Sequence, residues 1–224
     1  MAEGLRHSQP MTDDSTSPRF FNPDEEIAVG HNRLPHWDQQ GKCYFITFRL
    51  FDSVPAALIR EHRLAEAAWL AAHPEPWTPD VEREHLQTFQ GQIERWLDQG
   101  LGECLLQLPD CAQIVATALG YHEGVRTRLH SWVVMPNHVH VLTEICTGWE
   151  LPALMKSWKG FTANEINHRL GRTGPFWQKG YHDRLIRNWE HFGNVLRYIR
   201  RNPVKGKLAP SSFLIGESDL ARRF

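Results

Sequence analysis

The sequence predicts one domain of mixed α and β structure with a helical elaboration. A strand at residues 42–50 precedes a long helical region, strands at 126–135 and 138–145 form a hairpin, and a helix, a short strand and a helix follow. Alternating apolar residues indicate strands, and apolar residues three or four apart indicate helices. With 224 residues, 41% of them hydrophobic, the chain can bury a substantial core.

The first strand is predicted by aromatic and β-branched residues that alternate between two faces over residues 42–50. Residues 56–72 are alanine-rich and predict a helix. A Pro-rich stretch breaks this helix, and a polar helical pattern resumes over residues 80–99. Another helix is expected from about Pro109 to about Tyr121, because proline suits a first helical turn. These segments exceed what one crossover needs, which predicts an insertion at about residues 74–105.

The second half begins with two strands that a tight Pro136-Asn137 turn joins. A helix over residues 151–170 follows, and Gly171 is suited to end it. Its expected apolar stripe consists of Leu151, Leu154, Met155, Trp158, Phe161 and Ile166. A short strand is expected at residues 181–186.

The last predicted helix begins after Asn188, which can cap it. It is expected to end near Asn202, since Pro203 disfavours helical geometry in the residue before it. The expected buried stripe of this helix consists of Trp189, Phe192, Leu196 and Ile199.

The hydropathy of the chain and the spacing of its cysteines limit the class of protein that it can be. No apolar run approaches the roughly 20 residues of a bilayer span, and residues 1–24 lack the apolar region of a secretory signal. The four cysteines are widely spaced, which favours reduced thiols in a cytoplasm. Residues 1–32 are interpreted as a flexible lead-in, residues 33–208 as the domain, and residues 209–224 as a tail.

Charge is distributed unevenly along the chain. The formal net charge is only −1, yet residues 151–210 contain 12 Lys and Arg against 3 Asp and Glu. A localised positive surface attracts a polyanion whatever the total charge. The alternative is a solvated basic face with no partner.

Two histidines in the second strand of the hairpin are candidate metal ligands. His138 and His140 project from the same face, about 7 Å apart along the backbone, so both imidazoles can reach one divalent ion. Polar side chains on an apolar strand need partners. The alternative is a pair of histidines satisfied by ordinary hydrogen bonds.

The last helix carries the candidate nucleophile, Tyr198. It lies roughly 130° from the centre of the apolar stripe, and Asn202 lies one turn further along nearly the same line. An amide oxygen is a hard ligand that suits Mg²⁺ or Mn²⁺. The alternatives are a tyrosine at the rim of a helix interface and an asparagine that ends the helix. Tyr181 is the rival nucleophile.

Basic and aromatic side chains near these residues are candidates for DNA contacts. Arginines beside a tyrosine can clamp phosphates and can favour the phenolate, and aromatic residues interleaved with basic ones can stack on bases. More often such aromatic residues are core. The candidates are Lys156, Lys159, Arg169, Trp177, Lys179, Arg187, Arg197, Arg201 and Lys205.

Four motifs in this order resemble those of the REP-associated tyrosine transposases, relatives of the single-tyrosine HUH (IS200-like) transposases. They are the strand Tyr44–Arg49, the hairpin segment Trp132–Leu142 with His-Val-His, the triplet Phe176–Gln178, and the helical segment Tyr198–Lys205. The resemblance covers about residues 33–208. It implies an α+β, ferredoxin-like or RRM-like fold with an antiparallel sheet and helices on one face.

The resemblance also implies a function. A divalent metal, Mg²⁺ or Mn²⁺, would be held by His138, His140 and Asn202. Tyr198 would form a covalent 5′-phosphotyrosine with single-stranded DNA near palindromic hairpins, in an enzyme that is a monomer or a homodimer.

Two other functions are consistent with parts of the sequence. A domesticated protein could keep the fold and bind DNA hairpins without cleaving them. A histidine-triad nucleotide hydrolase would need a third alternating histidine, but Leu142 occupies that position.

Overall fold

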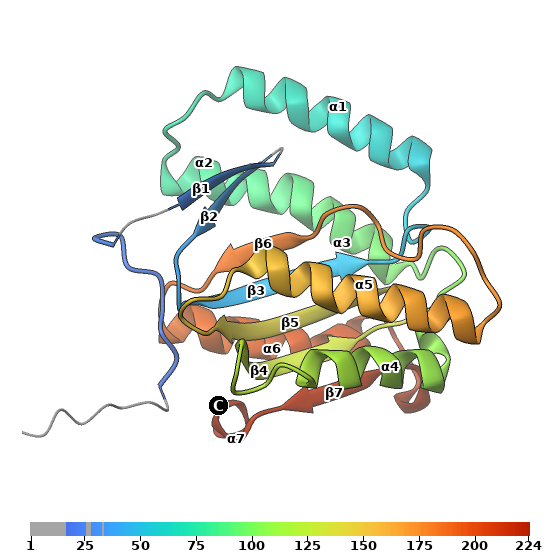
Figure 1. The fold of residues 1–224 in the computed structure, drawn as a ribbon. Helices are drawn as coiled ribbons and strands as arrows, with labels where there is room; N and C mark the ends of the chain where they lie inside the picture. The colour runs from blue at the N-terminus through green and yellow to red at the C-terminus, as the bar shows by residue number, and fades with distance from the viewer. Residues whose placement is uncertain (1–16, 26–27, 33) are drawn as a thin grey trace, which may run out of the picture.

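The computed structural model describes residues 17–25, 28–32 and 34–224. Its centre is a five-stranded antiparallel sheet in the order β6-β3-β5-β4-β7 (Figure 1). The strands are β3 (Cys43–Arg49), β4 (Thr127–Val134), β5 (His138–Ile145), β6 (His182–Leu185) and β7 (Leu214–Glu217). A separate antiparallel pair consists of β1 (Ala28–Asn32) and β2 (Leu34–Asp38). The four strands expected in the sheet are therefore present.

The helices also follow the sequence pattern closely. They are α1 (Ala56–Ala72), α2 (Pro79–His85), α3 (Gly91–Asp98), α4 (Pro109–Gly120), α5 (Leu151–Arg169), α6 (Trp189–Lys205) and α7 (Asp219–Arg222). A π-helical stretch, Leu86–Gln90, joins α2 to α3, and short 3-10 helices occupy Leu105–Gln107 and Pro210–Ser212.

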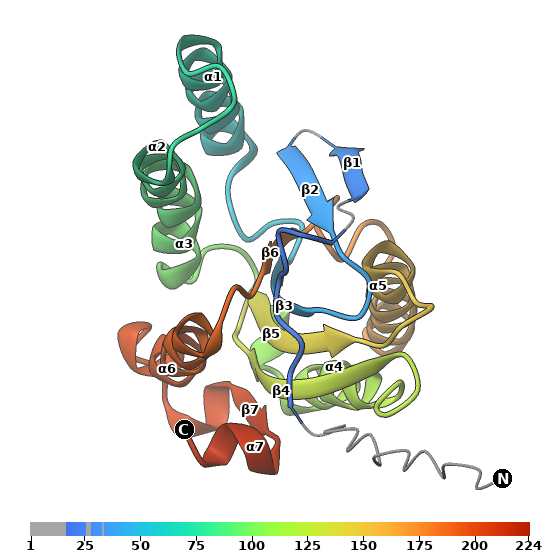
Figure 2. The ribbon, with the colours of Figure 1, turned by 90° about the vertical axis from the view of Figure 1, so that its left-hand side faces the viewer.

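Side chains of the sheet alternate between two hydrophobic cores. On β3, Tyr44 and Ile46 face the core formed with α4 and α5, while Cys43 and Phe45 face the core formed with α6 and α7. Figure 2 shows α5 and α6 on opposite sides of the sheet. The α+β antiparallel fold is confirmed, but helices cover both faces rather than the one face expected. The sheet is apolar on both sides, so each face needs a covering layer.

The helical elaboration between β3 and β4 lies beyond the β6 edge of the sheet (Figures 1 and 2). It includes α1, none of whose residues is buried, as well as α2 and α3. Aromatic rings hold α1 to the rest: Trp69 lies 5.1 Å from the His85 ring and 5.9 Å from the Phe89 ring, between ring centroids. Only α4 completes the crossover by packing on the sheet.

Proline does not end α6 where the sequence predicted. The helix includes Pro203 and continues to Lys205, and the Asn202 carbonyl accepts a hydrogen bond from Gly206 N at 2.9 Å. Proline disfavours helical geometry in the preceding residue without forbidding it. Asn202 therefore lies inside the helix, one turn after Tyr198.

Two of the expected stripe residues are not buried. Phe161 of α5 is 56% exposed, and Thr162 takes its place in the interior. Trp189 of α6 is 41% exposed and stacks on Phe224 at 5.4 Å between ring centroids. Both lie at the edge of their stripe, where helical periodicity alone does not separate core from rim.

Both ends of the described chain contribute to the sheet region. Arg19 O accepts a hydrogen bond from Cys43 N at 2.8 Å, and Phe21 N donates to Ile186 O at 2.9 Å. Residues 1–16 of the expected lead-in lie outside the described residues. Residues 209–224 are not a tail outside the domain, because β7 pairs with β4. Four residues are too few to show a period-two pattern.

Within the part of the chain that the structure describes, no helix combines the length and the hydropathy needed to cross a membrane.

The fit of β7 against β4 can be tested at Gly216. A Cβ there would overlap the indole ring of Trp132, whereas a Cβ at Gly160 in α5 would meet nothing within 4 Å. We expect Gly216→Ala to destabilise the fold by about 1–3 kcal/mol through steric strain. Gly160→Ala should stabilise it by about 0.5–1 kcal/mol. Thermal unfolding measures both, and an unchanged midpoint for Gly216→Ala would refute this packing.

Candidate functional site

The histidine pair lies on the α6 face of β5, in the interior. His138 and His140 are 2% and 1% exposed, and their Nε2 atoms face each other at 3.1 Å. The strand alternation that predicted a shared face therefore holds. Two ring nitrogens this close must either share a proton or bind a common cation.

Neighbouring side chains orient both rings. The Asn137 amide nitrogen donates to Leu97 O and Leu101 O, each at 3.2 Å, which turns its Oδ1 toward His138 Nδ1 at 2.7 Å. His138 Nδ1 must therefore carry the proton, which leaves the Nε2 lone pair free to accept. His140 Nδ1 lies 2.8 Å from Thr47 Oγ1. Support of the far ring nitrogen is typical of metal-binding histidines.

Both imidazoles are neutral at neutral pH. Burial lowers the pKa of His138 to about 3, with a smaller contribution from the positive charge of Lys205. Burial and the neighbouring His138 lower the pKa of His140 as well. Neutral imidazoles with converging lone pairs are the form that binds a metal.

The helix α6 brings Tyr198 and Asn202 to this pair. The Tyr198 ring meets the His140 ring edge-on at 5.2 Å between centroids and the Phe45 ring at 5.6 Å. Asn202 is 2% exposed, lies against His138 and hydrogen-bonds Tyr198. Its Oδ1 has no hydrogen bond with acceptable geometry among the described residues.

These atoms fit a divalent cation. A buried amide oxygen left without a partner is costly, and here it accompanies two ring nitrogens that have at most one proton between them, which a cation could replace. A cation would satisfy all three acceptors at once. Two imidazoles and one amide oxygen provide three ligands and leave further positions for water or phosphate oxygens.

The insertion reaches the site through α3, which the sequence did not predict. Glu94 hydrogen-bonds the Tyr198 hydroxyl, and Lys205 Nζ lies 2.6 Å from Asp98 Oδ2. Burial and the Glu94 charge raise the pKa of Tyr198, and burial raises the pKa of Glu94. The expectation that nearby arginines favour the phenolate is therefore not met. Arg197 donates to Asn194 and Arg200 to Glu217.

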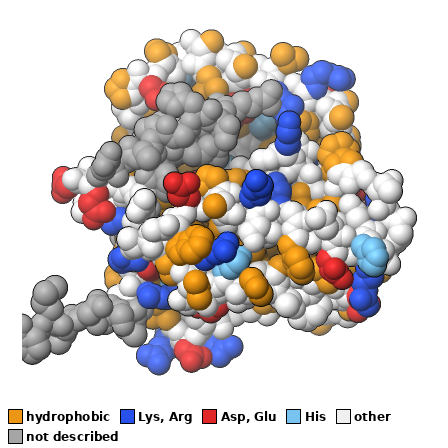
Figure 3. All heavy atoms as spheres, in the orientation of Figure 1, with side chains coloured by type: hydrophobic (Ala, Val, Ile, Leu, Met, Phe, Trp, Pro, Cys, Tyr) orange, Lys and Arg blue, Asp and Glu red, His pale blue; other side chains and the backbone are white. Residues whose placement is uncertain are grey.

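The nine candidate DNA contacts do not form one surface. Lys156, Lys159 and Arg169 belong to α5 and Arg197, Arg201 and Lys205 to α6, on opposite faces of the sheet (Figure 2). On the face in Figure 3, Lys and Arg side chains are scattered among hydrophobic and acidic ones.

Several of these basic groups already have acidic or carbonyl partners. Arg169 pairs with Asp110 at 2.5 Å, and Lys159 Nζ donates to Gln178 O at 2.8 Å. Burial lowers the pKa of Lys159 to about 8. The candidates whose side chains are exposed are Lys156, Arg169, Lys179, Arg187, Arg197, Arg201 and Lys205.

Two aromatic candidates lie away from the histidine pair. Trp177 is 7% exposed and belongs to the core under α5, where its Nε1 donates to Thr162 Oγ1 at 2.9 Å. The expectation that Trp177 stacks on DNA bases is therefore wrong, because the ring is already covered. Tyr181, the rival nucleophile, also packs against that core, whereas Tyr198 packs against the core on the histidine side.

Buried neutral histidines make the stability of the metal-free protein depend on pH. His138 and His130 have folded pKa values of about 3 and about 4, so the unfolded chain binds more protons below about pH 6.5. We expect the free energy of unfolding to fall on acidification by on the order of 1 kcal/mol per histidine and pH unit. Urea unfolding in EDTA between about pH 7.5 and 5.5 measures this loss, and a pH-independent midpoint would contradict it.

The comparisons with known proteins place this geometry in a family context. No curated protein matches the chain. Among solved structures, the chain is similar to one titled as a REP-associated tyrosine transposase bound to a REP hairpin. The two chains are 17% identical in sequence, and their superposition has a TM-score of 0.43. The aligned region covers 80% of this chain and 76% of the other.

A family model described as "Transposase IS200 like" matches residues 112–202. This segment includes the histidine pair, Tyr198 and Asn202, and the match indicates a transposase-like role in DNA processing. This segment is therefore similar to the IS200-like transposases, the resemblance that the sequence motifs predicted.

Proposed function

We propose that the protein is a metal-dependent endonuclease and strand transferase that acts in the cytoplasm on single-stranded DNA near palindromic hairpins. It would work as a monomer or a homodimer, through a covalent 5′-phosphotyrosine on Tyr198. One observation carries the proposal. A phenol from α6 lies against two converging imidazoles of β5 and hydrogen-bonds an amide whose oxygen has no hydrogen-bond partner among the described residues.

In the proposed step, the Tyr198 oxygen forms a bond to the scissile phosphorus while the bond from phosphorus to the 3′-oxygen breaks. The phenol proton passes to Glu94, which hydrogen-bonds the hydroxyl. The departing 3′-oxygen takes up a proton from solvent and becomes a 3′-hydroxyl. The phosphotyrosine conserves the energy of the phosphodiester bond. The released 3′-hydroxyl can therefore attack it and reverse the reaction, or the 3′-hydroxyl of another DNA end can attack it and become joined instead.

His138, His140 and Asn202 would hold the divalent ion, Mg²⁺ or Mn²⁺. When bound, this ion would neutralise charge on the non-bridging phosphate oxygens and orient the phosphate. Asn137 keeps the His138 ring in position through the ring Nδ1 atom, and Thr47 does the same for the His140 ring. The Asn202 amide also hydrogen-bonds the Tyr198 hydroxyl.

The insertion competes with DNA for basic side chains on α6 and just before it. Glu82 of α2 pairs with Arg187 at 2.5 Å, and Asp98 of α3 pairs with Lys205 at 2.6 Å. Residues 79–98 contain five Asp and Glu against two Arg. A DNA phosphate that bound Lys205 would have to replace the Asp98 carboxylate.

The nucleophile is tested with Tyr198→Phe. This variant lacks the attacking oxygen, so we expect no protein–DNA adduct with a labelled palindromic single strand in Mn²⁺, while hairpin binding remains within about two-fold because the ring contacts persist. Denaturing gels measure the adduct, and band shifts measure binding. EDTA should abolish the adduct in the unaltered protein.

The matched control is Tyr181→Phe, which removes a hydroxyl from the opposite side of the sheet and should leave the adduct yield unchanged. Adducts of normal yield from Tyr198→Phe would sink the assignment. Shifted bands from the unaltered protein without any adduct would instead favour the non-cleaving hairpin-binding alternative.

The competition is tested with Asp98→Asn. Removal of this carboxylate frees Lys205 for phosphate, so we expect hairpin binding to tighten by about two- to five-fold, as for a partly exposed ion pair, with a steeper salt dependence. Fluorescence anisotropy at two salt concentrations measures both. Asp80→Asn, which removes the same charge from a pair within α2, should have a smaller effect. Equal or weaker binding by Asp98→Asn would rule out the competition.

A further inference from the structure

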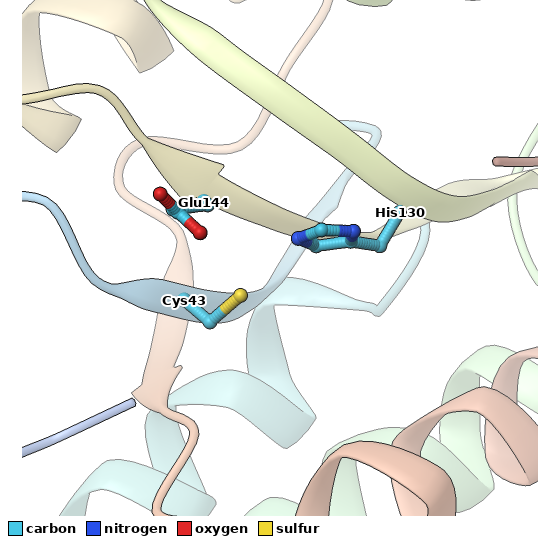
Figure 4. Close-up of side chains that lie close together, drawn as sticks. All are labelled: Cys43, His130 and Glu144. Atoms are coloured by element: carbon cyan, nitrogen blue, oxygen red, sulfur yellow. The ribbon is translucent and has the colours of Figure 1, made fainter. Parts of the chain in front are cut away.

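A second group of polar side chains meets on the α6 face, towards the other end of β5. It consists of Cys43 from β3, His130 from β4 and Glu144 from β5 (Figure 4). One potential ligand atom from each lies within 4.8 Å of the others. The three residues are 0%, 2% and 1% exposed. Complete burial of three such groups together is unusual without compensation.

The sheet register explains how they meet. Cys43 and Glu144 are directly opposite each other across β3 and β5, so their side chains leave the same face. His130 lies at the register shift between Leu129 and Ser131 of β4. A bulge of this kind re-aims a side chain. In Figure 4 the tip of the His130 ring points toward the space between Cys43 and Glu144.

The His130 ring supplies the observation that points to a ligand. Its Nε2 is buried and has no hydrogen-bond partner among the described residues, a state that costs free energy unless something occupies the position. Phe192 of α6 closes the other side, edge-on at 5.2 Å between ring centroids. Burial lowers the pKa of His130 to about 4, so the ring is neutral near pH 7.

Glu144 and Cys43 bring complementary chemistry. The carboxylate accepts from the Arg19 backbone N and from Arg19 Nε, each at 3.0 Å, and lies 3.7 Å from Arg128 Nη1. A carboxylate offers about four lone-pair positions, so it can still bind a cation. Burial raises the pKa of the Cys43 thiol. Without a cation, the thiol keeps its proton.

We propose that Cys43, His130 and Glu144 form a structural site for a thiolate-binding divalent ion of the zinc type. Sulfur, imidazole and carboxylate ligands together are typical of tetrahedral zinc. Tetrahedral bond lengths place ligand atoms roughly 3.5 Å apart, so atoms that lie within 4.8 Å of one another must move closer by roughly 1.3 Å at most. On binding, a metal–sulfur bond replaces the sulfur–hydrogen bond and the proton leaves to solvent. A water or the second carboxylate oxygen completes the coordination.

This site is separate from the histidine pair. His140 and Glu144 are four residues apart on β5, about 13 Å along a strand. The two donor sets also differ. Two imidazoles and an amide suit an ion that keeps open positions for a substrate, whereas the buried thiolate set encloses its ion and ties β3, β4 and β5 together. The ion would be acquired during folding, because no side chain of the set is accessible afterwards.

Cobalt substitution tests the site directly. The full chain is refolded with Co²⁺ and exchanged into buffer without free metal, and its near-ultraviolet absorption is recorded. We expect about one tightly held equivalent per chain with a thiolate-to-cobalt charge-transfer band. Zinc-refolded protein should likewise retain about one equivalent in elemental analysis.

Variants identify the ligands. Cys43→Ser and His130→Gln should lose the band, while Cys111→Ser, which removes another buried thiol, should keep it. The double variant His138→Ala/His140→Ala should also keep it, so failure at the histidine pair is distinguishable from failure here. Refolded unaltered protein without a thiolate–cobalt band would overturn the proposal, as would a band of normal intensity in Cys43→Ser.

Discussion

Packing of α6 across the central strand β5 is the contact on which the rest of the site depends. Phe192, Leu196 and Ile199 are fully buried against the sheet, so the helix cannot rotate without opening this core. In that fixed orientation, Tyr198 and Asn202 meet the two histidines. The alternation of β5 is equally strict, because a slip of one residue would send both imidazoles to the α5 side.

Opposite charges then connect the insertion to α6. The net charge of −1 conceals a basic second half and an acidic first half, and the structure brings the two together at Glu82, Asp98 and their basic partners. An acidic first half therefore does not argue against DNA binding. Its carboxylates form ion pairs with cationic groups near Tyr198. Their negative charge also raises the free energy needed to ionise the Tyr198 phenol.

The α6 face of β5 combines two polar groups of different chemistry on one apolar sheet. Buried polar side chains are tolerated only where partners satisfy them. At one end, Asn137 and Thr47 orient two imidazoles, and at the other, Arg19 holds Glu144 beside a thiol and a ring nitrogen. In both groups a buried acceptor lacks a hydrogen-bond partner within the described part of the chain: Asn202 Oδ1 in one and His130 Nε2 in the other.

The sequence by itself determined the features that depend on local periodicity: the strand that pairs His138 with His140, and the helix that places Asn202 one turn after Tyr198. It also revealed the resemblance to the IS200-like transposases, since those motifs occur in order. It misplaced Trp177 and the end of α6, because burial and helix continuation depend on packing partners. Only the tertiary structure decided that Glu94 contacts the tyrosine and that Cys43, His130 and Glu144 converge. Such contacts join residues far apart in the chain, and no local pattern records which elements will pack together.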